Sequence, residues 1–394
     1  MRALSSGVIA GVLLTLLSFA SGVRTAHADP LPKAQALEAC KTANFGPDTP
    51  YGETAAEKQA KHIAFVWNCA AMVEGRTDAA FEQYVSKDFC DHSHLMTSGQ
   101  KDCADWAATR QSFARMAKQF GSGPTVEVPV MASVNGEMVT MYGEGVDIFR
   151  VHDGKLTDHW DASPPAEVTI HAHAPGFTAW VLGDRKGPPP MVPGAEPGVL
   201  VDQALLTAVN TGPLTPYAET QKESDAKRTV FRWNYMSIIL GKRKEAAAMF
   251  LADNFCDHSH MVTRAQKECA TRDEVANRVM AARAPLKVGD HVEIPRLGTV
   301  SGEMVTMYGA GVDIFRVVDG KITDHWDASP GKEVTIHAHN INVVEEMIHV
   351  LRGEARARGP AGDGGPGGPG GPGGPDGPGP GGAGPAATGG PPKT

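Results

Sequence analysis

The sequence lacks the features that mark nucleic-acid-binding and membrane-spanning proteins. Its 394 residues carry 37 Lys and Arg against 45 Asp and Glu, a formal net charge of −8, with no basic run to offset that balance. An acidic chain repels phosphate backbones, so nucleic acid is not expected as a partner. Beyond the N-terminal segment, no stretch reaches the ~18 consecutive apolar residues that a spanning helix needs, so no membrane contact is expected after that segment is removed.

Motifs for common cofactor chemistry are also missing. The sequence has no Gly-x-x-x-x-Gly-Lys-Ser/Thr phosphate loop, no His-Glu-x-x-His zinc motif and no Gly-x-Ser-x-Gly nucleophile elbow. Gly143-Glu144-Gly145 lacks the third glycine and the helix of a dinucleotide site. We therefore expect no nucleotide or redox cofactor.

Both ends of the chain differ in composition from a folded domain. Arg2, the apolar stretch from Val8 to Phe19 and the small-x-small sequence Ala26-His27-Ala28 predict a secretory signal peptide over residues 1–28. The protein is then expected to be secreted or periplasmic; an N-terminal membrane anchor is the alternative. Residues 353–394 are rich in Gly and Pro, which predicts a disordered tail.

The body of the chain contains the same module twice. A shift of 166 positions places Phe89-Cys90-Asp91-His92-Ser93-His94 on residues 255–260 without a change. Residues 136–164 match 302–330 except at three positions. Two domains are therefore predicted, 31–175 and 198–350, joined by a Pro-rich linker over 176–197.

Each domain begins with helical periodicity and ends with strand periodicity. Apolar spacing predicts helices over 55–73, 79–85 and 105–120. The period then becomes two, which predicts strands over 126–133, 138–143, 146–152, 155–162 and 167–173, with Asp153-Gly154 as a hairpin turn. This order favours an α+β domain whose N-terminal helices cover one face of a curved antiparallel sheet.

The segment 147–161, Asp-Ile-Phe-Arg-Val-His-Asp-Gly-Lys-Leu-Thr-Asp-His-Trp-Asp, resembles the closing hairpin of SnoaL-like domains in the NTF2-like superfamily. The second domain repeats it over 313–327, and Asp88 to His92 looks like the family segment that ends in a pocket histidine. The resemblance implies two tandem cone-shaped domains, each with a pocket between its helices and its concave sheet. It also implies that the cones pair through their exposed sheet faces as a pseudo-dimer. The family includes cofactor-independent polyketide cyclases, steroid-isomerase-like enzymes and members of no known activity.

The repeat suggests how the six cysteines pair. Cys90 and Cys103 recur at the same spacing as Cys256 and Cys269, whereas the remaining two have no counterparts. A pair duplicated with its spacing is most simply bonded within each domain, and an oxidising compartment favours disulfides. The predicted disulfides are Cys40–Cys69, Cys90–Cys103 and Cys256–Cys269. Thiolate metal ligation and free thiols are the alternatives.

Ten of the 15 histidines occupy equivalent positions in the two domains, and eight of these are candidate metal ligands. On a strand, His171-Ala172-His173 places both imidazoles on one face, an arrangement common at metal sites. Convergence with His92-Ser93-His94 would hold a divalent transition metal, with Asp91 as a ligand or orienting group. The candidate ligands are His92, His94, His171, His173, His258, His260, His337 and His339. The alternatives are polar strand ends bonded to loops and side chains that line an organic pocket.

Acid/base chemistry is the second prediction for these residues. His159 and Asp161 lie two residues apart on one strand and therefore share a face. In a pocket, Asp161 would be a general base, His159 or His92 a general acid, and Tyr142 a donor to a developing enolate. Alternatively, Trp160 faces the core. If only one face of the strand is covered, His159 and Asp161 then face solvent or a subunit contact. The candidate catalytic residues are His92, Tyr142, His159, Asp161, His258, Tyr308, His325 and Asp327.

These observations predict an exported protein with a small-molecule pocket in each domain. An enzyme of this kind would carry out isomerase, cyclase or aldol-type chemistry, without a cofactor, on a small hydrophobic or carbonyl-containing molecule. The alternatives are a non-catalytic ligand-binding or carrier protein and a histidine-rich metal-binding protein.

Overall fold

The computed structural model describes two large parts of the chain, one for each repeat. The main described ranges are 31–42, 52–97, 102–120, 128–143, 145–173, 219–263, 267–278, 297–309 and 311–336, with shorter stretches and single residues between them. The predicted tail, His337 and His339 lie outside the described residues, as do nearly all of the predicted leader and linker. Residues 1–355 belong to one compact unit, which contains both repeats.

The two repeats have matching helical layers. The first repeat contains α1 (Lys33–Thr42), α2 (Ala55–Asn68), the π-helical turn η1 (Cys69–Val73), α3 (Thr77–Tyr84), α4 (His94–Thr97) and α5 (Trp106–Phe120). The second contains α8 (Gln221–Asn234), η2 (Tyr235–Ile239), α9 (Arg243–Phe250), α10 (His260–Thr263) and α11 (Arg272–Arg278). Helices α2 and α8 both begin with a capping box, formed by Thr54 with Glu57 and by Thr220 with Glu223, which satisfies backbone donors of the first turn.

Each repeat also has one six-stranded sheet, and the two sheets have equivalent strand orders. The first runs β4-β3-β9-β8-β7-β6, with β3 (Val85–Asp91), β4 (Ala104–Asp105), β6 (Met131–Asn135), β7 (Met138–Tyr142), β8 (Val146–His152) and β9 (Lys155–Asp161). The second runs β13-β12-β18-β17-β16-β15, with β12 (Leu251–Asp257), β13 (Ala270–Thr271), β15 (Leu297–Ser301), β16 (Met304–Tyr308), β17 (Val312–Val318) and β18 (Lys321–Asp327). The predicted turn has φ 47° at Asp153 and 73° at Gly154, as a two-residue type I′ hairpin requires.

The α+β class is confirmed. We expected antiparallel sheets, but each sheet is mixed because it contains one parallel pairing. Strand β3 runs parallel to β9, with Asp91 beside His159 in the register. No strand was predicted at β3, because its buried residues do not alternate regularly and its register with β9 is interrupted by a bulge. Its partner also lies far along the chain, where local periodicity carries no information about pairing.

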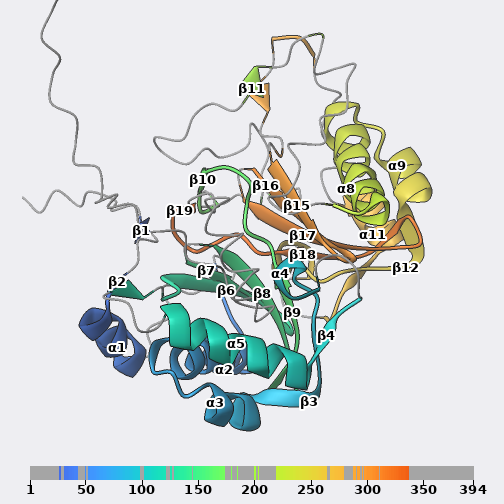
Figure 1. The fold of residues 1–394 in the computed structure, drawn as a ribbon. Helices are drawn as coiled ribbons and strands as arrows, with labels where there is room; N and C mark the ends of the chain where they lie inside the picture. The colour runs from blue at the N-terminus through green and yellow to red at the C-terminus, as the bar shows by residue number, and fades with distance from the viewer. Residues whose placement is uncertain are drawn as a thin grey trace, which may run out of the picture. The chain divides into compact units, whose positions relative to one another are not determined.

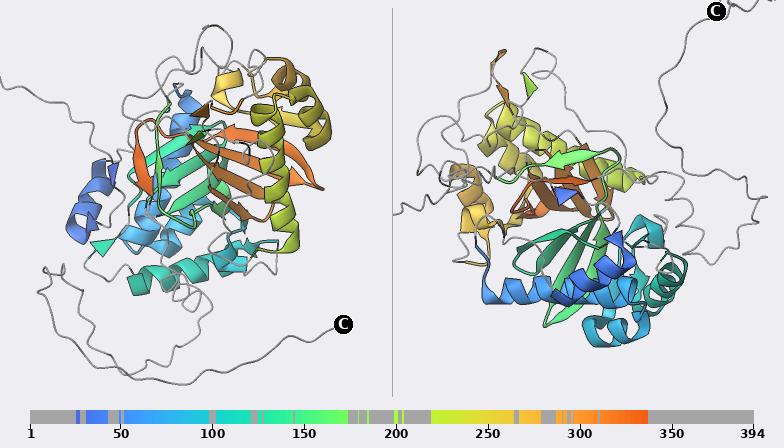
Figure 2. Two further views of the ribbon diagram at one scale, coloured as in Figure 1. Left: turned by 90° about the horizontal axis from the view of Figure 1, so that it is seen from above. Right: turned by 90° about the vertical axis from the view of Figure 1, so that its left-hand side faces the viewer.

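Both faces of the first sheet are covered. Helices α2, α3 and α5 lie along one face (Figures 1 and 2), where Trp67 packs edge-on against Phe149 at 5.3 Å between ring centroids. The opposite face packs against the second repeat, in an apolar cluster that includes Tyr142, Ile148, Tyr308 and Ile314. The expectation that one strand buries only one set of side chains is therefore wrong: His159 is 6% exposed, Trp160 9% and Asp161 6%.

The contact between the repeats joins equivalent residues, as in a two-fold symmetric dimer. Strand β10 (Val168–Ile170) pairs antiparallel with β19 (Val334–Ile336), so that Thr169 faces Thr335 with 3.0 Å between the hydroxyl oxygens. Thr169 and Thr335 are equivalent positions of the repeat. Strand β1 (Ala26–His27), within the predicted leader, pairs parallel with β19. Two short strand pairs complete the described strands: β2 (Leu31–Pro32) with β5 (Thr125–Val126), and β11 (Val199–Leu200) with β14 (His291–Val292).

The predicted disulfides Cys40–Cys69, Cys90–Cys103 and Cys256–Cys269 are confirmed. They fit an oxidising, extracellular setting. Within the described ranges, no helix has the length and apolar character needed to cross a bilayer.

Candidate ligand-binding cleft

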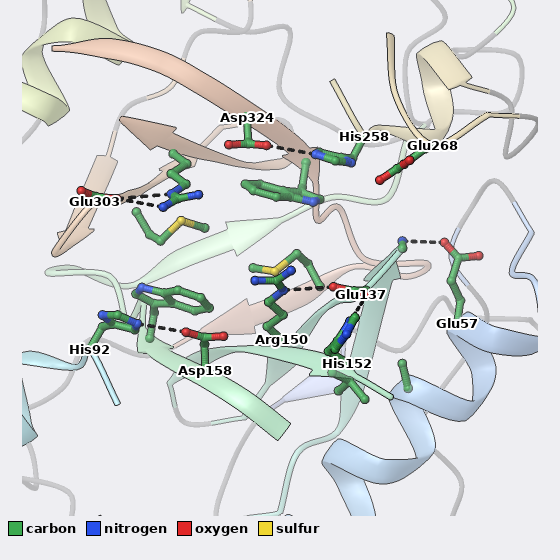
Figure 3. A pocket seen from close by; sticks show the side chains of 18 of the residues that line it. Glu57, His92, Glu137, Arg150, His152, Asp158, His258, Glu268, Glu303 and Asp324 are labelled. Atoms are coloured by element: carbon green, nitrogen blue, oxygen red, sulfur yellow. Dashed lines mark hydrogen bonds and ion pairs between the residues drawn. The ribbon is translucent and has the colours of Figure 1, made fainter. Parts of the chain in front are cut away.

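A cleft of about 1410 Å³ lies between the two repeats. Both repeats contribute equivalent side chains to its walls, and Figure 3 shows several of them on opposite sides of the cavity. The equivalent pairs include Glu57/Glu223, His92/His258, Glu137/Glu303, Met138/Met304, Arg150/Arg316, Asp158/Asp324 and Trp160/Trp326. The resemblance, in contrast, implies a pocket inside each domain.

Strand register explains why these side chains reach the cleft. Arg150 lies opposite Met138 on β7 and opposite Asp158 on β9, so the three share one face of the first sheet. Trp160 follows Asp158 by two residues and points to the same side. Tyr142 lies on this face too, where the sheets touch. The face that joins the repeats at one end therefore forms a wall of the cleft at the other.

Each wall carries a histidine stacked on a tryptophan. The rings of His92 and Trp160 lie 4.8 Å apart at an interplanar angle of 4°, and those of His258 and Trp326 lie 4.9 Å apart at 4°. His92 Nε2 is 3.2 Å from Asp158 Oδ1, and His92 Nδ1 is 2.9 Å from the carbonyl oxygen of Asp102. Both partners only accept hydrogen bonds, so both contacts are satisfied when each ring nitrogen carries a proton.

The aspartates beside these histidines are ionised at neutral pH. Burial raises the pKa of Asp158, but hydrogen bonds from His92 and Thr157 together lower it by more, so its pKa lies below the usual value. Asp324 shifts in the same direction for the same reasons, through His258 and Thr323. A carboxylate with a lowered pKa is a weak base, so Asp158 is better suited to orient His92 than to abstract a proton.

Two buried ion pairs cross between the repeats where the helices meet the cleft. His260 Nε2 lies 2.5 Å from Glu57 Oε1, and His94 Nε2 lies 2.6 Å from Glu223 Oε1. Burial raises the pKa of Glu57, but hydrogen bonds from His260 and from the backbone of Thr54 and Gly136 lower it to about 2. Burial lowers the pKa of His260, yet its hydrogen bond to Glu57 and the Glu57 charge raise it overall. His94 and His260 therefore each pair with a glutamate of the opposite repeat and join the two repeats.

His159 and Asp161, which were predicted to act as an acid/base pair, have different hydrogen-bond partners. His159, on β9, faces the helical layer, where its ring centroid lies 6.3 Å from that of Phe113 on α5. Its nitrogens lie 3.1 Å from Asp91 and 3.0 Å from Asp147, and its ring stacks on Phe149 at 4.7 Å. Burial lowers its pKa, but the charge of Asp91 and hydrogen bonds to Asp147 and Asp91 raise it to about 10. His325 is held in the same way by Asp257 and Asp313, which raise its pKa well above its usual value.

Three of the other predicted catalytic residues, Tyr142, Tyr308 and Asp327, contact the opposite repeat. The hydroxyls of Tyr142 and Tyr308 donate to the carbonyls of Ala328 and Ala162 of the opposite repeat, and burial raises the pKa of both phenols. Asp161 accepts a hydrogen bond from the Ser163 amide at 2.8 Å. Asp327 lies 3.3 Å from His173 of the first repeat. Of the eight predicted catalytic residues, His92 and His258 line the cleft, and the other six lie elsewhere.

The predicted metal ligands among the described residues each pair with a different carboxylate. His92 pairs with Asp158, His94 with Glu223, His171 with Glu333 and His173 with Asp327. Among the described residues, ligand atoms converge in two equivalent trios, Cys90 with His92 and Asp158, and Cys256 with His258 and Asp324. The sulfur of each trio is bonded in a disulfide and is not a thiolate ligand. Metal binding by the histidines stays a prediction.

Several residues of the cleft were missed in the sequence, although a signal for them existed. Asp158, Arg150 and their equivalents lie in the nearly invariant repeated segment, and strand alternation puts Asp158 on the same side as Trp160. Acidic residues in the loops, Asp102 and Glu268, had no periodicity to mark them.

Comparison with protein-family models and with curated proteins finds no match to this chain.

Proposed function

We propose that this is an exported protein of the SnoaL-like type that binds a small organic molecule in the cleft between its two repeats. The observation that carries the proposal is the cleft itself, about 1410 Å³ in volume and lined by equivalent residues of both repeats. Ligand sites are concave, combine apolar and aromatic surface with a few polar groups, and typically enclose about 300–1,000 Å³. Trp160, Met138 and their equivalents supply the apolar surface here.

The family assignment and export are supported by separate features. The repeated hairpin sequence, the helices on one face of each sheet and the pairing of equivalent strands fit two SnoaL-like domains. The signal-peptide pattern and the three disulfides fit export to an oxidising compartment.

Binding without turnover is favoured over acid/base catalysis. The predicted acids and bases are divided among the cleft, the helical layers and the contact between repeats. The pair that reaches the cleft, His92 with Asp158, combines a weak base with an imidazole that has a partner on each nitrogen. It is therefore suited to hold the Trp160 ring in place.

The proposal is tested by filling the cleft. A fragment library is screened by ligand-observed NMR against the wild-type protein, a Met138→Trp/Met304→Trp variant and a Met249→Trp control. Met138 and Met304 line the cleft, whereas Met249 is 54% exposed on α9. Fragments should bind the wild type and the control but not the filled variant. Equal binding to all three proteins, or no binding to the wild type, would refute the proposal; either single substitution replaces the double one if the double variant does not fold.

A further inference from the structure

The charged groups of the cleft are predominantly acidic. The lining includes nine carboxylates, from Glu57, Asp102, Glu137, Asp153, Asp158, Glu223, Glu268, Glu303 and Asp324, and four Lys or Arg side chains. All four of these cations already have a carboxylate within 4.0 Å: Arg150 pairs with Glu137, Arg316 and Lys222 with Glu303, and Lys267 with Glu274. A bound anion would therefore compete with existing partners for every one of these cations.

Two of the carboxylates are left for a ligand. Asp102 and Glu268 are equivalent positions of the repeat, and both are exposed and line the cleft. Within the described part of the chain, neither side chain takes part in an ion pair or a hydrogen bond. Figure 3 shows Glu268 beside the cavity, near His258. Among the described residues, each repeat therefore presents to the cleft one carboxylate that has no ion-pair partner there.

The backbone at Asp102 is held beside one of the stacked histidine–tryptophan pairs. The backbone carbonyl of Asp102 is 2.9 Å from His92 Nδ1, and His92 lies flat on Trp160. The next residue, Cys103, is tied to Cys90 by a disulfide. In the second repeat, Cys269 follows Glu268 and forms the equivalent disulfide with Cys256. Indole rings attract cations through the negative potential of their faces, more strongly than Tyr or Phe rings do.

We propose that the cleft selects organic cations, that is, amines or quaternary ammonium compounds with an apolar body. This inference rests on the proposed function, since it names the ligand class of the same cleft. The ammonium group gains from Asp102 or Glu268 and from the excess negative charge of the walls. The apolar body is buried against Trp160, Met138 and their equivalents. An anion of the same shape meets repulsion, and a neutral molecule gains only the apolar burial.

The test uses three probes with the same ring: benzylammonium, benzyl alcohol and benzoate. Their affinities for the full chain are measured by calorimetry near pH 7 and at two salt concentrations. Benzylammonium should bind about tenfold more tightly than benzyl alcohol, from charge attraction and the cation–π contact together. Benzoate should bind weakest, and the preference for the cation should shrink as salt increases.

Charge-neutralising variants locate the effect. Asp102→Asn and Glu268→Gln should each weaken benzylammonium binding about threefold and leave benzyl alcohol unaffected, as expected for one partly solvated charge. Asp88→Asn is the matched control, because Asp88 is exposed on β3 outside the cleft lining and its equivalent in the second repeat is Asn254. Equal affinity for the three probes, or an equal effect of Asp88→Asn, would overturn the inference. If fragments of any charge bind the wild type but not the Met138→Trp/Met304→Trp variant, the proposed function stands and only the preference for cations is refuted. If nothing binds the cleft, the proposed function and the preference for cations are both refuted.

Discussion

Replacing His260 with alanine should destabilise the protein by about 3 kcal/mol, because it leaves Glu57 buried without its ion-pair partner. Glu57 is 4% exposed, and its pKa falls from 4.5 to about 2. At 1.36 kcal/mol for each unit, this shift corresponds to about 3 kcal/mol in favour of the charged form. Part of it comes from the Thr54 and Gly136 amides, which the variant retains. Loss of one partner from a buried pair costs about 3–5 kcal/mol in other proteins, so the two approaches agree.

The pH dependence follows from the directions of the two shifts. Glu57 has a lowered pKa in the folded protein, so its contribution is complete above 4.5 and is lost as the pH falls towards 2. His260 has a raised pKa, so its contribution is complete below 6.5 and is lost as the pH rises through its folded value. The pair should therefore stabilise the protein most between pH 4.5 and 6.5.

Urea unfolding of the wild type, His260→Ala, Glu57→Gln and the double variant across this range gives the coupling energy directly. The exposed pair of Lys41 and Glu38, 3.0 Å apart on α1, provides a control cycle that should couple by less than about 1 kcal/mol. A Glu57–His260 coupling no larger than the control, or one that stays constant between acidic and alkaline pH, would show that the pair does not hold the repeats together electrostatically.

Four further variants test the packing. Tyr142→Phe and Tyr308→Phe should each cost about 1 kcal/mol in urea unfolding, because each leaves an alanine carbonyl of the opposite repeat without its donor; no loss in either would argue against the contact between repeats. Serine at both Cys256 and Cys269 should cost about 3 kcal/mol and lower the Tm, since their disulfide closes a short loop; an unchanged Tm would contradict this. Gly298→Ala should cost about 1–3 kcal/mol, because the added Cβ would lie 2.6 Å from the Phe231 ring, whereas the first repeat already has Ala132 at this position; wild-type stability would mean that the ring moves aside freely.

The sequence by itself determined the features that depend on local or repeated patterns. Constant spacing at an offset of 166 revealed the two copies and the pairing of the cysteines. Helical and two-residue periodicity located α2, α5 and strands β7 to β9 to within a few residues, and Asp153-Gly154 located a hairpin. These features are set by neighbours along the chain, so a single sequence contains them.

Only the tertiary structure decided where the histidines act. Alternation shows that His159 and Asp161 share a face, but it cannot show that helices cover that face while the other repeat covers the opposite one. Contacts between distant segments then assign His159 to the helical layer, His94 to the junction of the repeats and His92 to the cleft. The cleft itself exists because two sheets touch at one end and separate at the other, and no residue of either copy encodes that separation alone.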